Sequence, residues 1–143
     1  MNETVQLLQD VVRSARTGQD AVEQLMKKTE EGRMREELIR EKEDYAVTRR
    51  RGEQALADAG GSQEPAGPLE KAGMWAGLEM ETLMDRSDAH IAQIVIQGAT
   101  MGMIEMTRSL NTYDGADPDA RSLASQFVVN QNEAIDRQKG FLK

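Results

Sequence analysis

The stretch that decides the fold is AHIAQIVIQGATMGMIEMTRSL, residues Ala89 to Leu110. It contains the only histidine of the chain, two glycines four residues apart and three methionines. Its apolar run, residues 91 to 104, is interrupted by Gln93 and Gln97 and is shorter than the ~18 residues that a membrane-spanning helix needs. Apolar residues on several sides of a helix are typical of a helix that other elements cover. We therefore interpret this stretch as a packed helix of a soluble helical protein.

Composition predicts the all-α class for the whole chain. With 143 residues, the chain fits one domain that can bury a core of its own. Aromatic residues make up only 3% of it and prolines number three, while the residues typical of long helices dominate. Cysteine is absent, which excludes disulfides and thiolate sites. We expect a single all-α domain over residues 1–143.

Helix start and stop signals divide the chain into five helical segments. Asn2 and Ser87 are suitable N-caps, and Asp117-Pro118 combines an N-cap with a proline in the first turn. The pair Gly60-Gly61 is a helix stop signal. The predicted helices span residues 3–29, 33–59, 68–84, 87–112 and 117–142.

The lengths of the connections predict how the four long helices are arranged. Short turns join helix 3–29 to helix 33–59 and helix 87–112 to helix 117–142, so each pair forms an antiparallel hairpin. About 25 residues, including the short helix 68–84, separate the two hairpins. A connection of this length can run from one end of a bundle to the other. We therefore expect a four-helix bundle with one long crossover.

The chain resembles small, uncharacterised bacterial members of the ferritin-like superfamily over essentially its entire length. The resemblance rests on the helix order, on the crossover sequence GPLEKAGMWAGLEMETLMD and on the run HIAQIVIQGATMGMIEMTRSLN. It implies a ferritin-like four-helix bundle. The family pattern has no known activity attached to it.

A ferritin-like di-iron centre needs a Glu from each of two helices and a Glu-x-x-His motif from each of the others. This chain has a single histidine, His90, and the residue three positions before it is Ser87. Both histidines of the family motif are therefore missing. We expect no metal and no cofactor, and we expect His90 to lie near the surface at a helix start.

A carboxylate-only metal site is the alternative, because two carboxylate pairs have i, i+3 spacing. Its candidate residues are Glu41, Asp44, His90, Glu105, Glu133 and Asp136. Such pairs are common by chance on charged helices. Glu133 and Asp136 also lie off the inward stripe of their helix, which passes through Gln131 and Ala134.

Neutral polar side chains stand near the middle of the helices, where relatives of this fold hold ions. The heptad projection places six of them there, namely Gln19, Tyr45, Thr48, Gln97, Asn130 and Gln131. They either form a hydrogen-bonded layer that fixes helix register, or about half of them face water. The chain shows no nucleophile paired with a base at a recognisable spacing, so we expect no catalytic residues and no enzyme activity.

Glycine and methionine patterns predict close packing or self-association. Gly98 and Gly102 lie on one face of a helix, and each costs about 1 kcal/mol relative to alanine, so another backbone must approach closely. Either the crossover packs against this helix, or a second subunit does. Six of the nine methionines lie between residues 74 and 106, more than one face of a four-helix core can hide. The residues concerned are Gly73, Trp75, Gly77, Met80, Met84, Gly98, Met101, Gly102, Met103 and Met106.

Charge argues against two classes of partner. The net charge of −7 repels nucleic acid and anionic lipid. The only basic cluster, Arg49-Arg50-Arg51, has acidic neighbours, which indicates an ion-paired surface. The N-terminal sequence lacks the pattern of a signal peptide, and we expect a cytoplasmic protein.

The function that fits these patterns is that of a non-catalytic interaction or structural protein. We expect a homodimer formed through helix 87–112 and the crossover, with a further protein partner possible. One alternative is a metal-binding or oxidase-type protein with an atypical carboxylate site. Another is a module that binds a small apolar ligand in a methionine-rich groove near Trp75.

Overall fold

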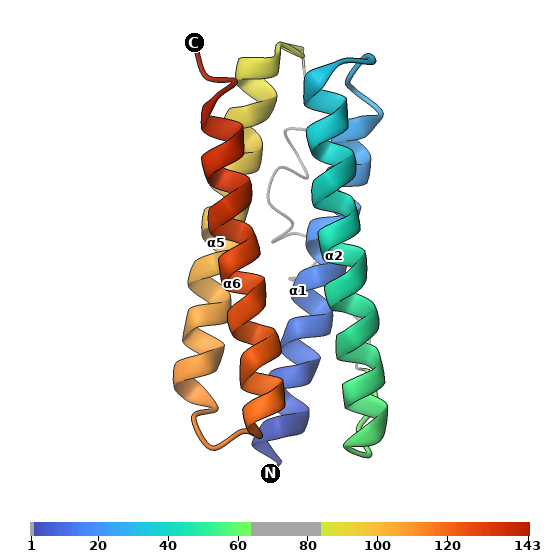
Figure 1. Ribbon diagram of the computed structural model, residues 1–143, viewed down its shortest axis with the longest axis vertical. Coiled ribbons are helices and arrows are strands. Elements are labelled where there is room, and N and C mark those ends of the chain that lie inside the picture. The colour runs from blue at the N-terminus through green and yellow to red at the C-terminus, as the bar shows by residue number, and fades with distance from the viewer. Residues whose placement is uncertain (1, 64–83) are drawn as a thin grey trace.

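Four long helices make up the part of the chain that the computed structural model describes, residues 2–63 and 84–143 (Figure 1). They are α1 (Glu3–Met26), α2 (Arg33–Asp58), α5 (Asp88–Thr112) and α6 (Pro118–Lys139), and these two ranges contain no strand. The predicted all-α class and the four long helices are confirmed. The predicted helix 68–84 lies outside the described residues, except for Met84, and so do Gly73, Trp75, Gly77 and Met80.

The helices α1, α5 and α6 begin at the N-caps that the sequence predicts. Asn2 Oδ1 accepts hydrogen bonds from the backbone N–H groups of Thr4 (3.0 Å) and Val5 (3.3 Å). Ser87 Oγ accepts one from the N–H of His90 (3.2 Å). Asp117 caps α6 in the same way, with Pro118 as the first helical residue. These caps satisfy N–H groups that have no partner within their own helix.

Both α1 and α6 end three residues earlier than predicted, at Met26 and Lys139. After each of them the backbone continues with tighter bonds between residues three apart, such as Thr29 N to Met26 O (3.3 Å). The Arg35 guanidinium also donates to the carbonyl groups of Met26 (2.7 Å) and Thr29 (3.2 Å). It thereby closes the first hairpin.

The second hairpin is closed by an arginine in the same way. Arg121 Nη1 donates to the carbonyl groups of Leu110 (2.9 Å) and Tyr113 (3.1 Å). In both hairpins the arginine lies in the first turns of the second helix and binds carbonyl groups at the end of the first. Such carbonyl groups have no partner within their own helix.

Three hydrogen bonds join the start of α1 to the segment after α2, to the end of α5 and to the start of α6. They join Gln9 Nε2 to Ser62 O (2.8 Å), Ser109 Oγ to Asp10 Oδ2 (2.8 Å) and Asp117 N to Thr4 Oγ1 (2.8 Å). The helix α1 therefore runs parallel to α6 and antiparallel to α2 and α5 (Figure 1). The end of α2 and the start of α5 lie at opposite ends of the bundle, as the predicted long crossover requires.

All four helices contribute to one core, and α1 packs against each of the other three. The largest fully buried apolar side chains are Leu7, Leu8, Leu25, Met34, Leu38, Ile91, Ile94 and Met106. Leu142 is 47% exposed, because α6 ends before it.

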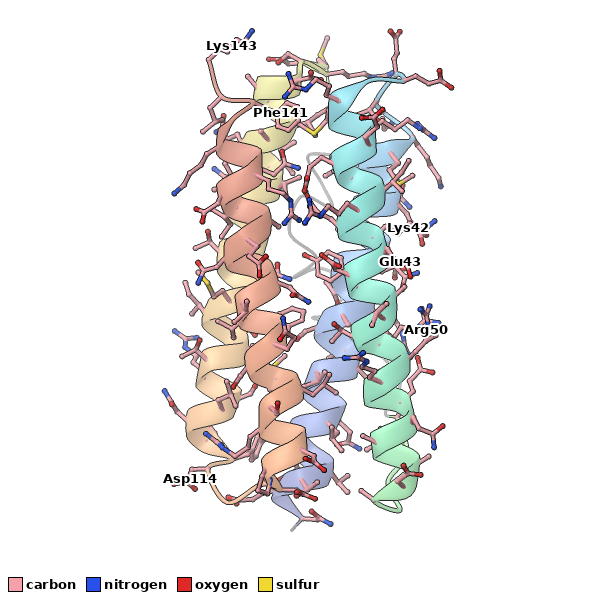
Figure 2. All side chains as sticks on the ribbon, in the orientation of Figure 1. Lys42, Glu43, Arg50, Asp114, Phe141 and Lys143 are labelled. Atoms are coloured by element: carbon pink, nitrogen blue, oxygen red, sulfur yellow. The ribbon has the colours of Figure 1, made fainter. Side chains whose placement is uncertain are left out.

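The outer side of α2 carries ion pairs (Figure 2). Arg49 Nε lies 2.8 Å from Glu53 Oε1, and Arg50 Nη2 lies 3.5 Å from Glu43 Oε1. The predicted ion-paired character of the basic cluster is confirmed for these two arginines. Among the residues described, no helix combines the length and the hydropathy that crossing a bilayer needs.

The end of α2 requires a glycine. Gly60 has a φ of 76°, in the left-handed region. This turn lets the N–H of Gly60 bond to Ala57 O (3.0 Å) and that of Gly61 bond to Leu56 O (2.9 Å), which is a Schellman motif.

We expect Gly60→Ala to destabilise the protein by about 1 kcal/mol, because a Cβ disfavours the left-handed conformation. Urea unfolding measures this loss. Gly60→Asn is the matched control and should lose less, because asparagine tolerates positive φ better than alanine does. An alanine variant as stable as the wild type would contradict the motif.

Candidate functional site: a buried polar layer between α2 and α6

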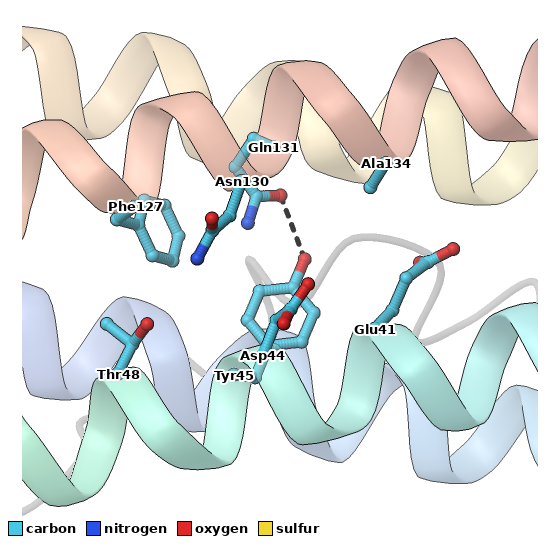
Figure 3. Close-up of a pocket in the computed structure, with 8 residues that line it drawn as sticks. All are labelled: Glu41, Asp44, Tyr45, Thr48, Phe127, Asn130, Gln131 and Ala134. Atoms are coloured by element: carbon cyan, nitrogen blue, oxygen red, sulfur yellow. Dashed lines mark hydrogen bonds between the residues drawn. The ribbon is translucent and has the colours of Figure 1, made fainter.

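Polar residues interrupt the inward stripe of α2 at its middle. The buried positions of α2 follow three- and four-residue spacing and are Met34, Leu38, Glu41, Tyr45, Thr48, Gly52 and Leu56. On α6 the buried residues include Gln131 and Gln138. Because the two helices are antiparallel, these polar side chains meet across the seam between them, and Figure 3 shows those around Tyr45 and Gln131. Glu41, Tyr45, Thr48, Gln131 and Gln138 are here called the polar layer.

The centre of the polar layer is a hydrogen bond between Tyr45 and Gln131. The Tyr45 hydroxyl donates to Gln131 Oε1 at 2.8 Å, and both residues are buried. Burial raises the pKa of the Tyr45 hydroxyl, so this group stays protonated and remains a donor. The Tyr45 ring also packs against Phe127 in a tilted arrangement, with ring centroids 6.2 Å apart.

The Tyr45 ring lies directly over Gly18 of α1. A Cβ added at Gly18 would overlap the ring atoms Cε1, Cζ and Cδ1 of Tyr45. The ring cannot move aside freely, because its hydroxyl is held by Gln131 on the far side. Tyr45 therefore joins α1, α2 and α6 at one level, and the absence of a side chain at position 18 makes room for it.

The second pair of the polar layer joins a carboxyl group to an amide. Gln138 Nε2 donates to Glu41 Oε2 at 2.7 Å, and the exposed fractions of Glu41 and Gln138 are 2% and 0%. Burial, and after it the neighbouring carboxyl group of Glu37, raises the pKa of Glu41 to about 9, against the opposing effects of the hydrogen bond from Gln138 and of Arg137. Glu41 is therefore a neutral acid at pH 7.

An ion pair closes the seam beside Glu41. Arg137 Nε donates to both carboxylate oxygens of Glu37, at 2.8 and 3.0 Å, and the two side chains are 22% and 10% exposed. Three buried polar atoms next to this pair have no hydrogen-bond partner within the described structure, namely Glu41 Oε1, Gln138 Oε1 and Arg137 Nη2. Burying a polar atom without a hydrogen-bond partner costs free energy, so this cluster is a candidate for a functional role.

A small pocket adjoins the Tyr45–Gln131 pair (Figure 3). It is lined by Glu41, Asp44, Tyr45, Thr48, Phe127, Asn130, Gln131 and Ala134. The space that the centre of a water molecule can occupy is about 10 Å³, close to the minimum for one water. A cofactor or a metabolite needs a pocket of several hundred Å³.

The candidate metal ligands do not converge. Glu41 is buried against Gln138, and Asp44 is half-buried beside the small pocket. The exposed ones are Glu105, Glu133 and Asp136, while His90 is half-buried in the first turn of α5. Within residues 2–63 and 84–143, no three carboxylate or imidazole side chains form a group that could hold a metal ion.

Sequence projection identified three of the five members of the polar layer. Tyr45, Thr48 and Gln131 are buried as predicted. Gln97 is exposed, so its prediction is wrong: the buried positions 94, 95, 98 and 99 turn residue 97 outward.

Two other predicted members are only half-buried. Gln19 bonds to Glu23 (3.3 Å) and Arg49 (3.2 Å) at the edge of the bundle. Asn130 lines the small pocket and accepts a hydrogen bond from the exposed Gln126 (2.9 Å).

Glu41 and Gln138 were missed as members of the layer. Glu41 follows Leu38 by three residues and Gln138 follows Ala134 by four, so helical spacing placed both on the inward stripes. Residue type does not identify them, because glutamate and glutamine are mostly exposed in proteins.

The glycines and methionines predicted for close packing or self-association differ in their surroundings within the described residues. Gly98 is buried, which fits close packing, but a Cβ at Gly102 would lie 3.7 Å from the Phe127 ring, an ordinary contact. Met106 is fully buried and belongs to the core, so it is not available for self-association. Met84 is 95% exposed, Met101 is 47% exposed and Met103 is half-buried.

Comparison of the chain with protein-family models, with curated proteins and with solved structures gives no match. The functional argument therefore depends on the geometry of the bundle.

We expect Gly18→Ala to destabilise the protein and Gly102→Ala to stabilise it. Overpacking against Tyr45 costs about 1–3 kcal/mol, and the helix preference for alanine offsets at most about 1 kcal/mol of it. Gly102 has room for a methyl group, so only the helix preference acts there. Urea unfolding of both variants measures the difference, and equal effects would contradict the role of Gly18.

We expect Tyr45→Phe to destabilise the protein by about 1–3 kcal/mol, because it leaves Gln131 Oε1 buried without a donor. The double variant Y45F/Q131L removes both polar partners and should recover much of the loss. Chemical denaturation of the two single variants and the double variant gives the interaction free energy between Tyr45 and Gln131. Additive losses would show that the hydrogen bond does not stabilise the layer.

Proposed function

We propose that the protein is a non-catalytic bundle of ferritin-like architecture that acts as an interaction or structural protein and associates with a second copy through the outer face of α5. Two antiparallel hairpins whose middle helices run in the same direction are typical of ferritin-like bundles, which have one long crossover. The parallel course of α1 and α6 supports this architecture.

The interior supports a structural role. Neutral hydrogen-bonded pairs and one peripheral ion pair occupy the seam between α2 and α6. The adjoining pocket has room for about one water molecule. Layers of this kind fix which helices pair and in what register, at some cost in stability.

The observation that carries the proposed self-association is an exposed apolar pair on α5. Met101 and Ile104 are three residues apart, lie on one side of the helix and are each 47% exposed. A helix packed on one side is expected to be polar on its outer side. Neighbouring apolar side chains on the surface mark contact sites more often than isolated ones do. A two-fold dimer would bury the same face of both copies.

We expect the wild-type protein to elute as a dimer of the 15.9 kDa chain in size-exclusion chromatography with light scattering at micromolar concentration. Ile104→Glu should give a folded monomer, because it places a charge in the interface. The matched control is Ile39→Glu, which introduces the same charge at a 49% exposed isoleucine of α2 and should remain a dimer. A wild-type monomer, or equal effects of both changes, would refute this interface.

A further inference from the structure

The strongest remaining feature is the buried acid of the polar layer. Glu41 is 2% exposed and has one hydrogen-bond donor, Gln138. Its second oxygen, Glu41 Oε1, is one of three buried polar atoms in the described structure near this seam that have no partner. We propose that Glu41 is a proton-binding site that couples the packing of α2 on α6 to pH. The seam accommodates the protonated acid, and loss of the proton loosens it.

The described residues around Glu41 offer little to solvate a negative charge. The contact of Gly18 with Tyr45 and the ion pair of Glu23 with Lys42 place the middle of α1 at this level. The buried residues of α1 there, such as Val22, are apolar. A carboxylate without solvation or a partner costs several kcal/mol in such surroundings, so the group holds its proton instead.

The buried residues of α5 near this end of the bundle, from Ile91 to Val95, are apolar as well. Its titratable side chains there are the half-buried His90 and the exposed Asp88. Neither is bonded to Glu41 or Gln138. The charged and hydrogen-bonding groups that act on Glu41 therefore come from α2 and α6.

Charged groups on α2 and α6 also favour the protonated form. Glu37 lies one turn from Glu41 and adds its negative charge, and a protonated Glu41 can donate a hydrogen bond to it. Arg137 is the cation that opposes this effect, but its Nε is bonded to Glu37. Further along the seam Asp44 and Glu133 are both acidic. Burial and like charge therefore outweigh the attraction of Arg137.

The direction of the pH effect follows from proton binding. The pKa of Glu41 rises from 4.5 to about 9 on folding. Between these values the folded chain holds a proton that the unfolded chain has released, so stability falls as the pH rises through this range. Below it both forms are protonated, and Glu41 contributes no pH dependence.

The test compares urea unfolding of the wild type, Glu41→Gln and Glu43→Gln between pH 6 and pH 8. The unfolding equilibrium constant of the wild type, divided by that of Glu41→Gln, should rise about tenfold per pH unit, which corresponds to one proton. Glu43→Gln removes an exposed carboxylate from the same helix and should follow the wild type. Parallel pH dependences of the wild type and Glu41→Gln would overturn the proposal.

A second measurement uses the wild type alone, in case Glu41→Gln does not fold. Carbon NMR of the glutamate carboxyl groups should show one resonance, that of Glu41, that stays protonated through pH 7 while the others titrate in the acidic range. A Glu41 resonance with the midpoint of an exposed glutamate would overturn the proposal. The urea comparison uses one protein concentration for all three proteins, so that self-association affects each of them equally. The NMR titration reports the protonation of Glu41 directly.

Discussion

The arrangement of the helices depends on the position of one aromatic ring. Tyr45 fills the space over Gly18 of α1, and its hydroxyl bonds to Gln131 of α6. A shift of α2 by one helical turn, about 5.4 Å, would break the hydrogen bond and move the ring against larger side chains. The two contacts therefore specify the register of α2 against both neighbours at once. Apolar packing alone is less selective, because leucine and valine tolerate several registers.

The apolar core stabilises the bundle, and the polar layer makes it specific. The helix α1 contributes an almost unbroken apolar stripe, whereas the middle of α2 is occupied by Glu41, Tyr45 and Thr48. A buried acid and buried amides are rarely more stabilising than apolar residues of similar volume. They do, however, penalise any pairing that leaves them without partners. Among the described residues, the buried polar and charged side chains all lie on α2 and α6, so specificity is concentrated in the seam between these two helices.

The sequence alone predicted the helices well, because the signals involved are local. Asn2, Ser87 and Asp117 cap their helices as expected, and Gly60 ends α2. The lengths of the connections also predicted the direction of each helix. The ends of α1 and α6 were placed too late, because the tighter final turns depend on hydrogen bonds that composition does not show.

The polar layer was predicted only in part, because burial depends on neighbours distant in the sequence. Tyr45 and Gln131 are 86 residues apart, and their pairing follows only from the tertiary arrangement. Glu41 has the spacing of a core residue, but its charge suggested the surface. The role of Gly18 depends on the tyrosine above it, whereas the described residues approach Gly102 no closer than an ordinary contact. For these residues, helical spacing predicted burial more reliably than residue type did.

The arginines that close the hairpins bear on how the chain folds. Arg35 and Arg121 each bind carbonyl groups no more than 11 residues away along the chain. Contacts this local form quickly, since little chain entropy is lost in closing so short a loop. Each hairpin can therefore assemble before the two halves meet. We then expect the docking of the two hairpins, which brings Tyr45 to Gln131, to be the slow step that limits the rate of folding.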